Sequence, residues 1–511
     1  MSGGNVFGPA PRRFGFWRKF GRGARFRIYK SEIKSRCSKI RPCRAADPVV
    51  RSRAGQEGFV AGYARMKWKR LELTGWGRVS RAPTAAARPD RLGEVAAALR
   101  EGPASGGLSV YGAGRSYGDS ALNSNGQTCL SERLDRILAF DEGTGIVEVE
   151  PGVNFRKLMA VLLPRGWLFP VTPGTSFATI GGAVAHDVHG KNHEHAGTFG
   201  QHVTELDLIT ADGVRHRISP RSDPQWFRAT CGGCGLTGMI TRIAFKMRRV
   251  PSAFVDVTER RLKDLDAFFE AFEAAKDAGY SVGWIDALAT GASLGRGILE
   301  TAEPATGAGF SWREKRTHSA PFDFPGFTIN SYSVKAFNAL YLRRVPKQGR
   351  IRLKSYEEFF YPLDAISHWN RIYGGRGFHQ FQCVVPYSNG AKAIRRLLES
   401  IAASQAASPL TVLKRLGPGR AGCLSFPIEG YTLALDFPNR AGTETLYRAL
   451  VNITLDYGGR IYLAKDALLS AEAIPRMYPE LDRFRAIVDE IDPDARFQSD
   501  MSRRLNLRTP L

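Results

Sequence analysis

The sequence predicts an α+β protein with two domains of different texture. Its 511 residues are 43% hydrophobic and 24% charged, which is ordinary globular composition with enough apolar material for a sizeable core. Residues 66–251 alternate short strands with helices and glycine-rich loops. From residue 252 to 459 longer helical patterns alternate with strand-like runs, which favours an antiparallel sheet covered by helices.

The elements of the first region are placed by their apolar period and by turn residues. Residues 88–102 predict a helix that ends near Gly102, and residues 108–111 read as a strand that runs into a glycine-rich loop. The alternating segment 145–150 is typical of a half-buried strand, and a helix is expected from 155 to 163. Two strand-like runs within 205–218 flank Ala-Asp-Gly, which indicates a hairpin.

The second region is expected to be built from both element types in turn. Helical periodicity covers residues 262–274 and 391–402. Apolar, β-favouring runs at 378–385 and 432–436 predict strands, and a further strand is expected at 460–463.

The charge is concentrated at the start of the chain. Residues 1–65 hold 16 Lys and Arg against three acids, so this segment carries +13 of the net +24. Such an arm attracts anionic lipid or nucleic acid without specificity. We expect a disordered extension, or a start codon placed upstream of a true start at Met66. A transit-like peptide is the alternative. An export signal is disfavoured because no apolar segment follows Arg12-Arg13.

The cysteine content and the lengths of the apolar stretches indicate in which cellular compartment the protein is found. Seven cysteines, an odd number spread over a long chain, do not form a disulfide framework and fit a reducing compartment. No stretch reaches the roughly 18 uncharged apolar residues of a membrane span, so the protein is expected to be soluble or peripheral. Cys231 and Cys234 have metal-ligand spacing but lack a second ligand pair, so a tight turn of small residues is favoured over zinc or redox chemistry.

The first motif with chemical content is Gly112-Ala-Gly-Arg-Ser-Tyr-Gly-Asp119, directly after a predicted strand. Glycines allow a tight turn whose N–H groups approach a phosphate. No apolar helix follows, so the motif is not the Rossmann fingerprint. Alone, a plain turn explains it equally well.

Two further glycine clusters strengthen the phosphate interpretation. Pro173-Gly-Thr175 is followed by Thr179-Ile-Gly-Gly-Ala183, and a third cluster spans 231–238. Three such clusters within about 130 residues favour a large phosphate-bearing cofactor gripped from more than one side.

A histidine-rich run follows the second cluster. His186, His189, His193 and His195 lie close together, but glycines interrupt them and no Glu stands between two His at helical spacing. We therefore expect no metal. A polar loop that faces a cofactor and an anionic substrate fits better, with Lys191 as the positive charge.

At these residues the sequence resembles the vanillyl-alcohol-oxidase type of FAD-linked oxidases, and within it the family of the decaprenylphosphoryl-β-D-ribose oxidases. The resemblance covers residues 70–505 and leaves out the basic arm. The motifs that carry it occur in one order: Thr74–Arg78, Gly114–Asp119, His189–His193, Gly235–Gly238, Tyr361–Asp364, Leu424–Ile428, Tyr462–Asp466 and Ser499–Leu505.

The resemblance implies FAD and a split FAD-binding domain, formed by 66–251 and completed by 460–511, around a substrate-binding domain at 252–459. Carried over by position, the FAD contacts are Gly112, Ala113, Gly114, Arg115, Ser116, Tyr117, Gly118, Asp119, Gly174, Thr179, Ile180, Gly181, Gly182, His186, Asp187, Val188, His189, Ile240 and Tyr462. The substrate contacts are Tyr117, Lys191, Trp284, Gln380, Gln382, Lys414 and Asp436.

The resemblance also implies roles. Lys465 is the candidate base or hydroxyl-positioning group, with His189 as the second candidate. A lysine acts as a base only if burial or a nearby cation lowers its pKa, and a surface ion pair with Asp466 is the alternative. Lys191 and Lys414 would bind the substrate phosphate, although Lys414 also fits a solvated basic run. Gln380 and Gln382 share one side of a strand, because alternate residues do, and either bind sugar hydroxyls or face solvent.

Three positions depart from the family. Arg115 stands where relatives with covalent flavin carry a His, so non-covalent FAD is expected. Ala434 replaces the Cys of mycobacterial members that nitro-aromatic inhibitors attack. Thr432 replaces an Asn, which alters the fit around the sugar.

The leading hypothesis is oxidation of a polyprenylphosphoryl-β-D-ribose at the 2-hydroxyl, the first half of an epimerisation to the arabinose form in the bacterial cell envelope. An NAD(P)H-dependent short-chain reductase is the expected pathway partner. The enzyme is expected in the cytoplasm or at the cytoplasmic membrane, in contact with anionic lipid. A flavin oxidase of a free sugar, alditol or aldonolactone is the alternative. A nucleic-acid-binding protein, suggested by the charge, lacks any binding module.

Overall fold

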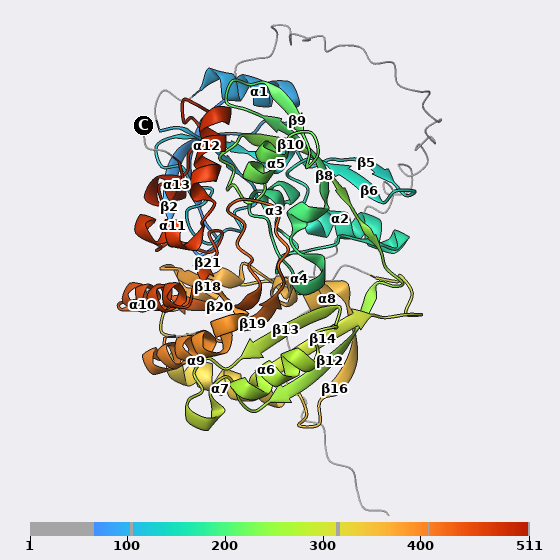
Figure 1. Ribbon diagram of the computed structural model, residues 1–511, viewed down its shortest axis with the longest axis vertical. Helices are drawn as coiled ribbons and strands as arrows, with labels where there is room; N and C mark the ends of the chain where they lie inside the picture. Colours follow the sequence, from blue (N-terminus) through green and yellow to red (C-terminus); the bar gives the residue numbers. More distant parts are fainter. Residues whose placement is uncertain (1–65, 103–105, 313–316, 407, 509–511) are drawn as a thin grey trace, which may run out of the picture. The chain divides into compact units, whose positions relative to one another are not determined.

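The computed structural model describes residues 66–102, 106–312, 317–406 and 408–508. The expectations for the basic arm at 1–65 lie outside these residues. Mixed helices and antiparallel sheets confirm the α+β class. In Figure 1 the first region of the chain lies above a large sheet formed by the second region.

The first region contains two sheets and short helices. The four-stranded sheet has the order β1-β2-β4-β3 and the five-stranded sheet the order β5-β6-β10-β8-β9. The strands are β1 (Lys69–Thr74), β2 (Arg81–Ala87), β3 (Leu108–Tyr111), β4 (Gln127–Leu130), β5 (Ile137–Asp141), β6 (Ile146–Val149), β8 (Val203–Ile209), β9 (Arg215–Ile218) and β10 (Met239–Lys246). The helices are α1 (Leu92–Glu101), α2 (Phe155–Leu162), α3 (Ile180–Ala185), α4 (His193–Ala196) and α5 (Pro224–Thr230). A two-residue strand pair joins β7 (Trp167–Leu168) to β11 (Arg248–Arg249).

The sequence-based predictions for this region are confirmed at the level of elements. The predicted strand at 108–111 is β3, the hairpin is the β8–β9 pair, and the two predicted helices are α1 and α2. Asn154 begins α2 because its side chain accepts a hydrogen bond from the Lys157 amide at 2.8 Å. Phe155, Leu158 and Leu162 then recur on the buried side of this helix.

The second region forms one eight-stranded sheet, and every strand pair in it is antiparallel. Its order is β16-β12-β14-β13-β19-β20-β18-β21. The strands are β12 (Phe254–Leu262), β13 (Tyr280–Ile285), β14 (Gly297–Pro304), β16 (Arg350–Ser355), β18 (Phe378–Pro386), β19 (Thr411–Leu416), β20 (Gly430–Pro438) and β21 (Arg460–Ile461). A separate pair joins β15 (His318–Ser319) to β17 (Ile366–Ser367).

Helices cover one face of this sheet. They are α6 (Leu265–Ala274), α9 (Tyr387–Ser404) and α10 (Thr443–Asp456), whose apolar side chains share a core with those of the sheet. The predicted helix at 262–274 begins later, because Leu262 ends β12 and Asp264 caps α6 by accepting a hydrogen bond from the Ala267 amide. Two further helices, α7 (Ser331–Arg343) and α8 (Tyr356–Phe360), flank the edge strand β16 in the chain.

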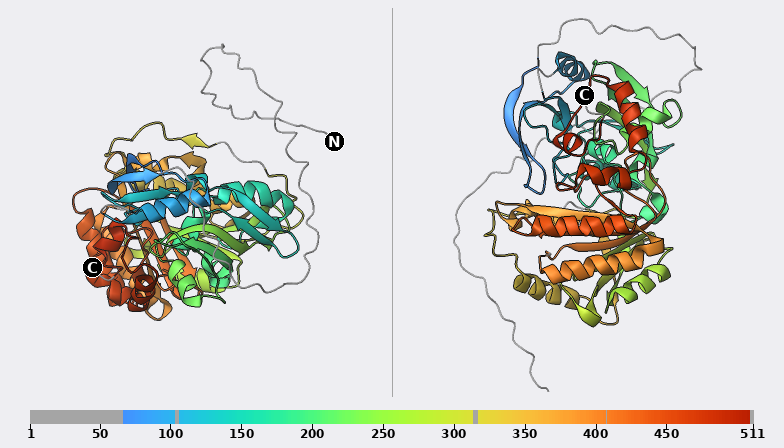
Figure 2. Two further views of the ribbon diagram at one scale, coloured as in Figure 1. Left: turned by 90° about the horizontal axis from the view of Figure 1, so that it is seen from above. Right: turned by 60° about the vertical axis from the view of Figure 1, so that its left-hand side comes forward.

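The C-terminal segment returns to the first region. It contains α11 (Ile474–Met477), α12 (Leu481–Ile491) and α13 (Asp500–Arg504), which lie beside the first strands in Figure 1 and in the right-hand view of Figure 2. The Leu108 amide donates to the Arg496 carbonyl at 2.7 Å, and the Gln498 amide donates to Leu108 at 2.8 Å. The predicted strand at 460–463 is shorter, and β21 pairs with β18 at the edge of the large sheet.

Candidate active site

The first glycine-rich loop begins where β3 ends, at Tyr111. Gly114 has a φ of 60°, in the left-handed region that favours glycine. A Cβ atom on Gly114 would lie 2.1 Å from the Tyr111 hydroxyl, which itself donates to the Thr74 carbonyl at 2.9 Å. The loop is therefore held against its own strand and could not accept a side chain at this point.

The second loop is organised by Thr179, the residue that begins α3. The Thr179 side chain accepts a hydrogen bond from the Gly182 amide at 3.1 Å, and its backbone forms an isolated bridge with Asn154. Gly181 packs against Pro151, where a Cβ atom would approach the proline to 2.7 Å. The glycines of this loop thus allow close packing of backbone on backbone.

The two loops meet. A Cβ atom on Gly112 would lie 2.7 Å from the Thr179 Oγ1, so the backbones of the two turns lie side by side. By contrast, a Cβ atom on Gly174 or Gly235 would meet nothing within 4 Å. Two joined turns beside open glycine backbone fit the diphosphate of a dinucleotide, which needs amide donors and no intervening side chains.

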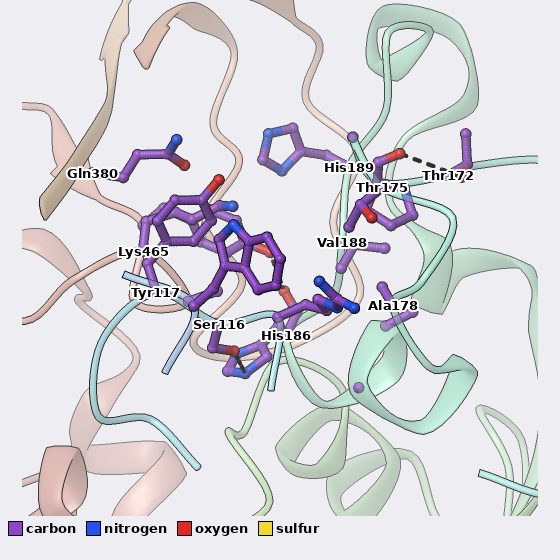
Figure 3. A pocket seen from close by; sticks show the side chains of 18 of the residues that line it. Ser116, Tyr117, Thr172, Thr175, Ala178, His186, Val188, His189, Gln380 and Lys465 are labelled. Carbon is purple, nitrogen blue, oxygen red and sulfur yellow. Dashed lines mark hydrogen bonds between the residues drawn. The ribbon is translucent and has the colours of Figure 1, made fainter. Parts of the chain in front are cut away.

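A cavity of about 450 Å³ extends from these loops to the large sheet. Both the first region and the second contribute to its walls, and Figure 3 shows part of it. Twenty-one of the predicted site residues line it: Gly112, Ala113, Gly114, Arg115, Ser116, Tyr117, Gly174, Thr179, Gly181, Gly182, His186, Val188, His189, Lys191, Ile240, Trp284, Gln380, Gln382, Lys414, Tyr462 and Lys465.

His186 connects the first loop to the third glycine cluster. Its Nε2 lies 3.1 Å from the Ser116 hydroxyl, a contact drawn in Figure 3, and its Nδ1 lies 3.8 Å from the Cys234 sulfur. The Tyr462 hydroxyl donates to the His186 carbonyl at 3.1 Å. Burial lowers the pKa of His186 to about 4, so the imidazole is neutral at physiological pH. This polar row closes one side of the cavity.

His189 is buried, and one of its ring nitrogens lacks a partner. Its Nε2 lies 3.1 Å from the Gln382 amide nitrogen and accepts that hydrogen bond. Burial, with Lys414 nearby, holds the pKa of His189 well below its usual range, so Nδ1 carries the proton. Among the described residues nothing accepts from this buried Nδ1. A buried donor at the cavity wall is a place where a ligand acceptor fits.

The floor of the cavity is one row of side chains across four neighbouring strands. Trp284 of β13 pairs in register with Val412 of β19, which pairs with Ala434 of β20, which pairs with Gln382 of β18. All four line the cavity. The opposite face of the same strands packs on helices α6, α9 and α10, because successive side chains of a strand point to opposite faces. Ala434 therefore stands at the centre of the floor.

Three lysines line the same cavity. Burial lowers the pKa of both Lys191 and Lys414 to about 8 and that of Lys465 to about 7. Within the described ranges none of the three forms an ion pair with a carboxylate. Lys191 instead donates to the Phe359 carbonyl and lies 4.0 Å from the centre of the Phe359 ring. Half-buried cations without acidic partners favour an anionic ligand.

Lys465 lies against the first loop. Its Nζ is 3.8 Å from the centre of the Tyr117 ring, and both side chains are labelled in Figure 3. The alternative of a pair with Asp466 does not occur, since Asp466 accepts from Arg504 at 2.9 Å and from the Tyr447 hydroxyl at 3.1 Å. Lys465 is therefore directed at the cavity, not at a surface ion pair.

Gln380 lines the same cavity as Lys465 and is bonded to the buried Asp436 behind it. The Gln380 amide donates to the Asp436 carboxylate at 2.6 Å, and the Tyr373 hydroxyl donates to it at 3.0 Å. Burial raises the pKa of Asp436 to about 7. Asp436 is fully buried and does not line the cavity, so its effect on a substrate would be exerted through Gln380.

Four residues expected at the cofactor also lie behind the cavity wall. Gly118 packs on the Asp466 carbonyl, Asp119 forms an ion pair with Arg504 at 2.7 Å, and Ile180 is fully buried in the core. Asp187 accepts from the amides of Gly200 and Ala421, both at 2.9 Å, and from the Ser425 hydroxyl. None of the four lines the cavity, and each fixes a loop that does.

Some wall residues were missed in the sequence. Arg344, Glu300 and Tyr341 line the end of the cavity beyond Trp284. Arg344 donates to Glu300 and to the buried Glu259, both at 2.9 Å. Arg344 was not among the predicted site residues, and only the acids Glu259 on β12 and Glu300 on β14 give it its place. Trp284, which was expected at the substrate, donates from its indole to the Pro409 carbonyl at 2.9 Å.

The histidine run and the pair Cys231 and Cys234 are the places where metal ligands would be expected. In the part of the chain that the structure describes, no group of three or more His, Cys, Asp or Glu side chains is arranged to hold a metal ion. Cys231 is fully buried and Cys234 has a φ of 55°, between two glycines with positive φ at 232 and 235. The Cys-Gly-Gly-Cys segment is a tight turn that closes α5.

Comparison with known families agrees with this site. The sequence model of a family described as FAD binding domain matches residues 83–219, which contain the first two glycine loops. A second model, described as D-arabinono-1,4-lactone oxidase, matches residues 328–505. The chain thus carries an FAD-binding domain, and it is a flavin-dependent oxidoreductase.

Individual relatives are similar over most of their length. The chain is 37% identical to decaprenylphosphoryl-β-D-ribose oxidase of Mycolicibacterium smegmatis over 85% of this chain and 97% of that protein. It is 23% identical to L-gulono-1,4-lactone dehydrogenase of Mycobacterium tuberculosis, over 83% and 96% respectively. It is 26% identical to an alditol oxidase of a Streptomyces species, over 73% and 85%. The chain belongs to the decaprenylphosphoryl-β-D-ribose oxidase family of FAD-linked oxidases.

Proposed function

We propose that this protein oxidises a polyprenylphosphoryl-β-D-ribose at its 2-hydroxyl to the 2-keto sugar, as the first half of an epimerisation to the arabinose form. The observation that carries the proposal is the cavity beside the joined glycine loops, in which the cations Lys191 and Lys414 form no ion pair with any described residue. A sugar phosphate supplies the anion that these cations lack. The name of the 37% identical relative supplies the sugar.

FAD would be held by the residues that line the loop end of the cavity. The diphosphate would bind the amides between Gly112 and Ser116 and those after Thr179, and the ring system would lie near His186 and Tyr462. Bound there, FAD would supply the acceptor for the hydride that leaves the oxidised carbon. Arg115, whose guanidinium lies 4.2 Å from the centre of the Trp76 ring, offers no atom for a covalent flavin bond. We therefore propose non-covalent attachment.

Removal of the hydroxyl proton falls to Lys465 in this proposal. A base must be neutral at working pH, and the pKa of Lys465 lies at about 7 because burial disfavours its ammonium form. His189 is the second candidate, since its neutral ring faces the same cavity. Its free lone pair is already engaged by the Gln382 amide, which argues for Lys465.

The remaining polar residues would bind the substrate. Lys191 and Lys414, whose pKa values lie at about 8, are cationic at neutral pH and would bind the phosphate. Gln380 and Gln382 would bind sugar hydroxyls, with Gln380 held in place by Asp436 at 2.6 Å. Trp284 and the Tyr117 ring would form the walls beside the sugar.

A spectroscopic experiment tests the proposal. The full chain is purified, its visible spectrum is recorded, and the release of yellow colour on heating is measured. Under anaerobic conditions, lipid-linked ribose phosphate should bleach the flavin band, whereas free ribose and alditols should not. Bleaching by free sugars alone would refute the proposed substrate, and a colourless chain that does not take up FAD would refute the site.

The second candidate is a flavin oxidase of a free sugar, an alditol or an aldonolactone. It is favoured by the match of residues 328–505 to the lactone-oxidase family and by the similarity to an alditol oxidase. The cations Lys191 and Lys414 argue against it, because a neutral polyol needs no positive charge beside it. The bleaching experiment distinguishes the two.

Two partners belong to the same proposal. The 2-keto product must be reduced to give the arabinose form, and we propose an NAD(P)H-dependent short-chain reductase for that step. A substrate with a lipid chain requires contact with a membrane surface, and we place the enzyme at the cytoplasmic membrane. Among the described helices none is both long and apolar enough to cross a bilayer. A coupled assay with reductase and vesicle-bound substrate tests both.

A further inference from the structure

Helix α7 and the chain on both sides of it, from residue 327 into β16, expose an unusual set of side chains. The exposed apolar residues are Phe327, Tyr332, Phe337, Leu340, Ile351 and Leu353. Tyr332 is 85% exposed, Phe327 76% and Leu340 68%, so these side chains are in water with little protein contact. Only Leu138, Val161, Val214, Phe322 and Ile366 are large apolar residues with comparable exposure elsewhere in the described chain.

The exposed apolar residues of α7 lie away from its buried side. Val334, Asn338 and Leu342 recur on the buried side, and Leu342 packs with Val345 and Ile298. Because the helix repeats every 3.6 residues, Tyr332 and Leu340 fall on the opposite side and Phe337 on the flank between the two. Such a helix normally buries its apolar side, and here two sides are apolar.

Cations surround these residues and acids are missing. Between residues 327 and 355 the sequence has seven Lys and Arg and neither Asp nor Glu. Three of the seven, Arg344, Arg350 and Lys354, pair with Glu259 of β12. The other four, Lys335, Arg343, Lys347 and Arg352, are exposed and form no ion pair within the described residues.

The buried ion pairs fix this segment against the sheet. Glu259 is fully buried and receives Arg344 at 2.9 Å and Lys354 at 2.9 Å, while Arg344 also contacts Glu300. The side that remains outward consists of aromatic and aliphatic side chains among unpaired cations. That combination is typical of a protein surface that inserts shallowly into an anionic lipid interface.

The same helix reaches the cavity. Tyr341 of α7 and Arg344, the residue after the helix, line the end of the cavity next to Trp284. Phe337 stacks on Tyr341 with ring centres 5.5 Å apart, which places the outward side one helical turn from the cavity wall. In Figure 1, α7 and β16 lie at the side of the large sheet away from the FAD-binding domain.

We propose that the outer surface formed by α7 and residues 344–353 docks on an anionic bilayer, so that a lipid-linked substrate passes beside α7 into the cavity. The part that concerns the substrate rests on the proposed function, whereas the docking itself does not. The apolar side chains enter the interface, and Lys335, Arg343, Lys347 and Arg352 contact lipid phosphates. The polyprenyl chain stays in the bilayer while the sugar phosphate reaches the lysines.

The test uses the full chain and vesicles of phosphatidylcholine, with and without phosphatidylglycerol. The basic arm at residues 1–65 is expected to attract anionic vesicles by its charge. Binding is therefore measured by co-sedimentation at low and high salt, because high salt screens that contribution. The variant Tyr332→Ser/Leu340→Ser is compared with Leu138→Ser/Val214→Ser, a control in which two exposed apolar residues of the first region are changed. We expect the first to lose about tenfold in salt-resistant binding and the control to lose none.

A charge variant tests the second component. Lys335→Glu/Arg343→Glu should weaken binding at low salt about tenfold, whereas Lys392→Glu/Arg396→Glu, two exposed cations of α9, should change it little. Binding at both salt concentrations that survives both surface variants would overturn the proposal. So would a loss of self-association in place of lipid binding, because the surface would then join two copies of the chain.

Turnover separates this proposal from the proposed function. Tyr332→Ser/Leu340→Ser should raise KM for lipid-linked ribose in vesicles about tenfold and leave kcat on a water-soluble, short-prenyl analogue unchanged. If the unaltered protein oxidises neither substrate but still binds vesicles through this surface, the proposed function fails and the docking stands. If it oxidises the vesicle-bound substrate and both surface variants do so equally well, the docking fails and the function stands.

Discussion

Gly112 and Thr179 belong to different turns, yet a Cβ atom on Gly112 would stand 2.7 Å from the Thr179 hydroxyl oxygen. That hydroxyl holds the Gly182 amide at 3.1 Å and so fixes the start of α3. The two turns are thus in close contact, and residues of both line the same cavity.

Gly112→Ala should weaken FAD binding. The added methyl group displaces the Thr179 hydroxyl, and loss of a helix cap costs about 1 kcal/mol, so we expect roughly a fivefold increase in the Kd for FAD. A titration of the FAD-free protein, followed by flavin fluorescence, measures it. Gly326→Ala is the control, because a Cβ atom there meets nothing within 4 Å. Equal FAD affinities of the two variants would show that the contact between Gly112 and Thr179 does not affect cofactor binding.

Lys465→Ala should keep the bound flavin and lose turnover. Loss of a general base lowers rates by about 10²- to 10⁴-fold. The absorbance spectrum reports the flavin and anaerobic bleaching reports the rate. Lys276→Ala, at an exposed position on the surface, is the matched control. Bleaching at the original rate would remove Lys465 from the mechanism.

The pH dependence should distinguish Lys465 from His189. A base must be deprotonated, so with a pKa of about 7 for Lys465, kcat/KM should rise about tenfold per pH unit below 7. Above pH 8 it should fall again, because Lys191 and Lys414 then lose the charge that binds the phosphate. His189 has a pKa well below its usual range, so a His189 base would give no rise between pH 6 and 7. The profile of the Lys465→Ala variant should have lost the step near pH 7.

Ala434→Cys should make the enzyme sensitive to the nitro-aromatic inhibitors that attack a cysteine in mycobacterial members of the family. Ala434 stands at the centre of the cavity floor, so a thiol there would meet whatever enters. The native chain should be insensitive, because the pKa of the cavity thiol Cys234 is raised to about 12 by burial and thiolate is scarce. Time-dependent inactivation, followed by mass of the adduct, measures the difference. Inactivation of the native chain would show that another cysteine reacts.

Local signals in the sequence predicted the glycine-rich loops. They did not predict which side chains pair with one another across the fold. The glycine clusters and the strand before Gly112 are adjacent in the chain, and their conformations follow from residue type. By contrast, Asp466 is paired by Arg504 and not by its neighbour Lys465, because a segment 38 residues away folds back onto it. Asp187, placed among cofactor contacts, turns inward to three donors that come from residues 200, 421 and 425.

The failure to predict Arg344 as a cavity residue has the same cause. In the chain between 327 and 355, some cations face solvent and others face inward. The sequence pattern of this segment does not tell the two kinds apart. Only the pairing of β12 with β16 brings Glu259 to Arg344 and so decides which cation faces inward. Strand pairings between residues almost 100 positions apart are not encoded by local period or propensity.

The return of the C-terminal segment to β3 has a consequence for biosynthesis. Arg496 and Gln498 close hydrogen bonds on Leu108, and Arg504 neutralises Asp119 behind the first loop. While the ribosome is still making the last tenth of the protein, those partners do not yet exist. The first glycine-rich loop and the strand before it then lack their support. A chain that ends before Arg496 would lack these partners of Leu108 and Asp119, and we expect it to bind FAD more weakly than the finished polypeptide.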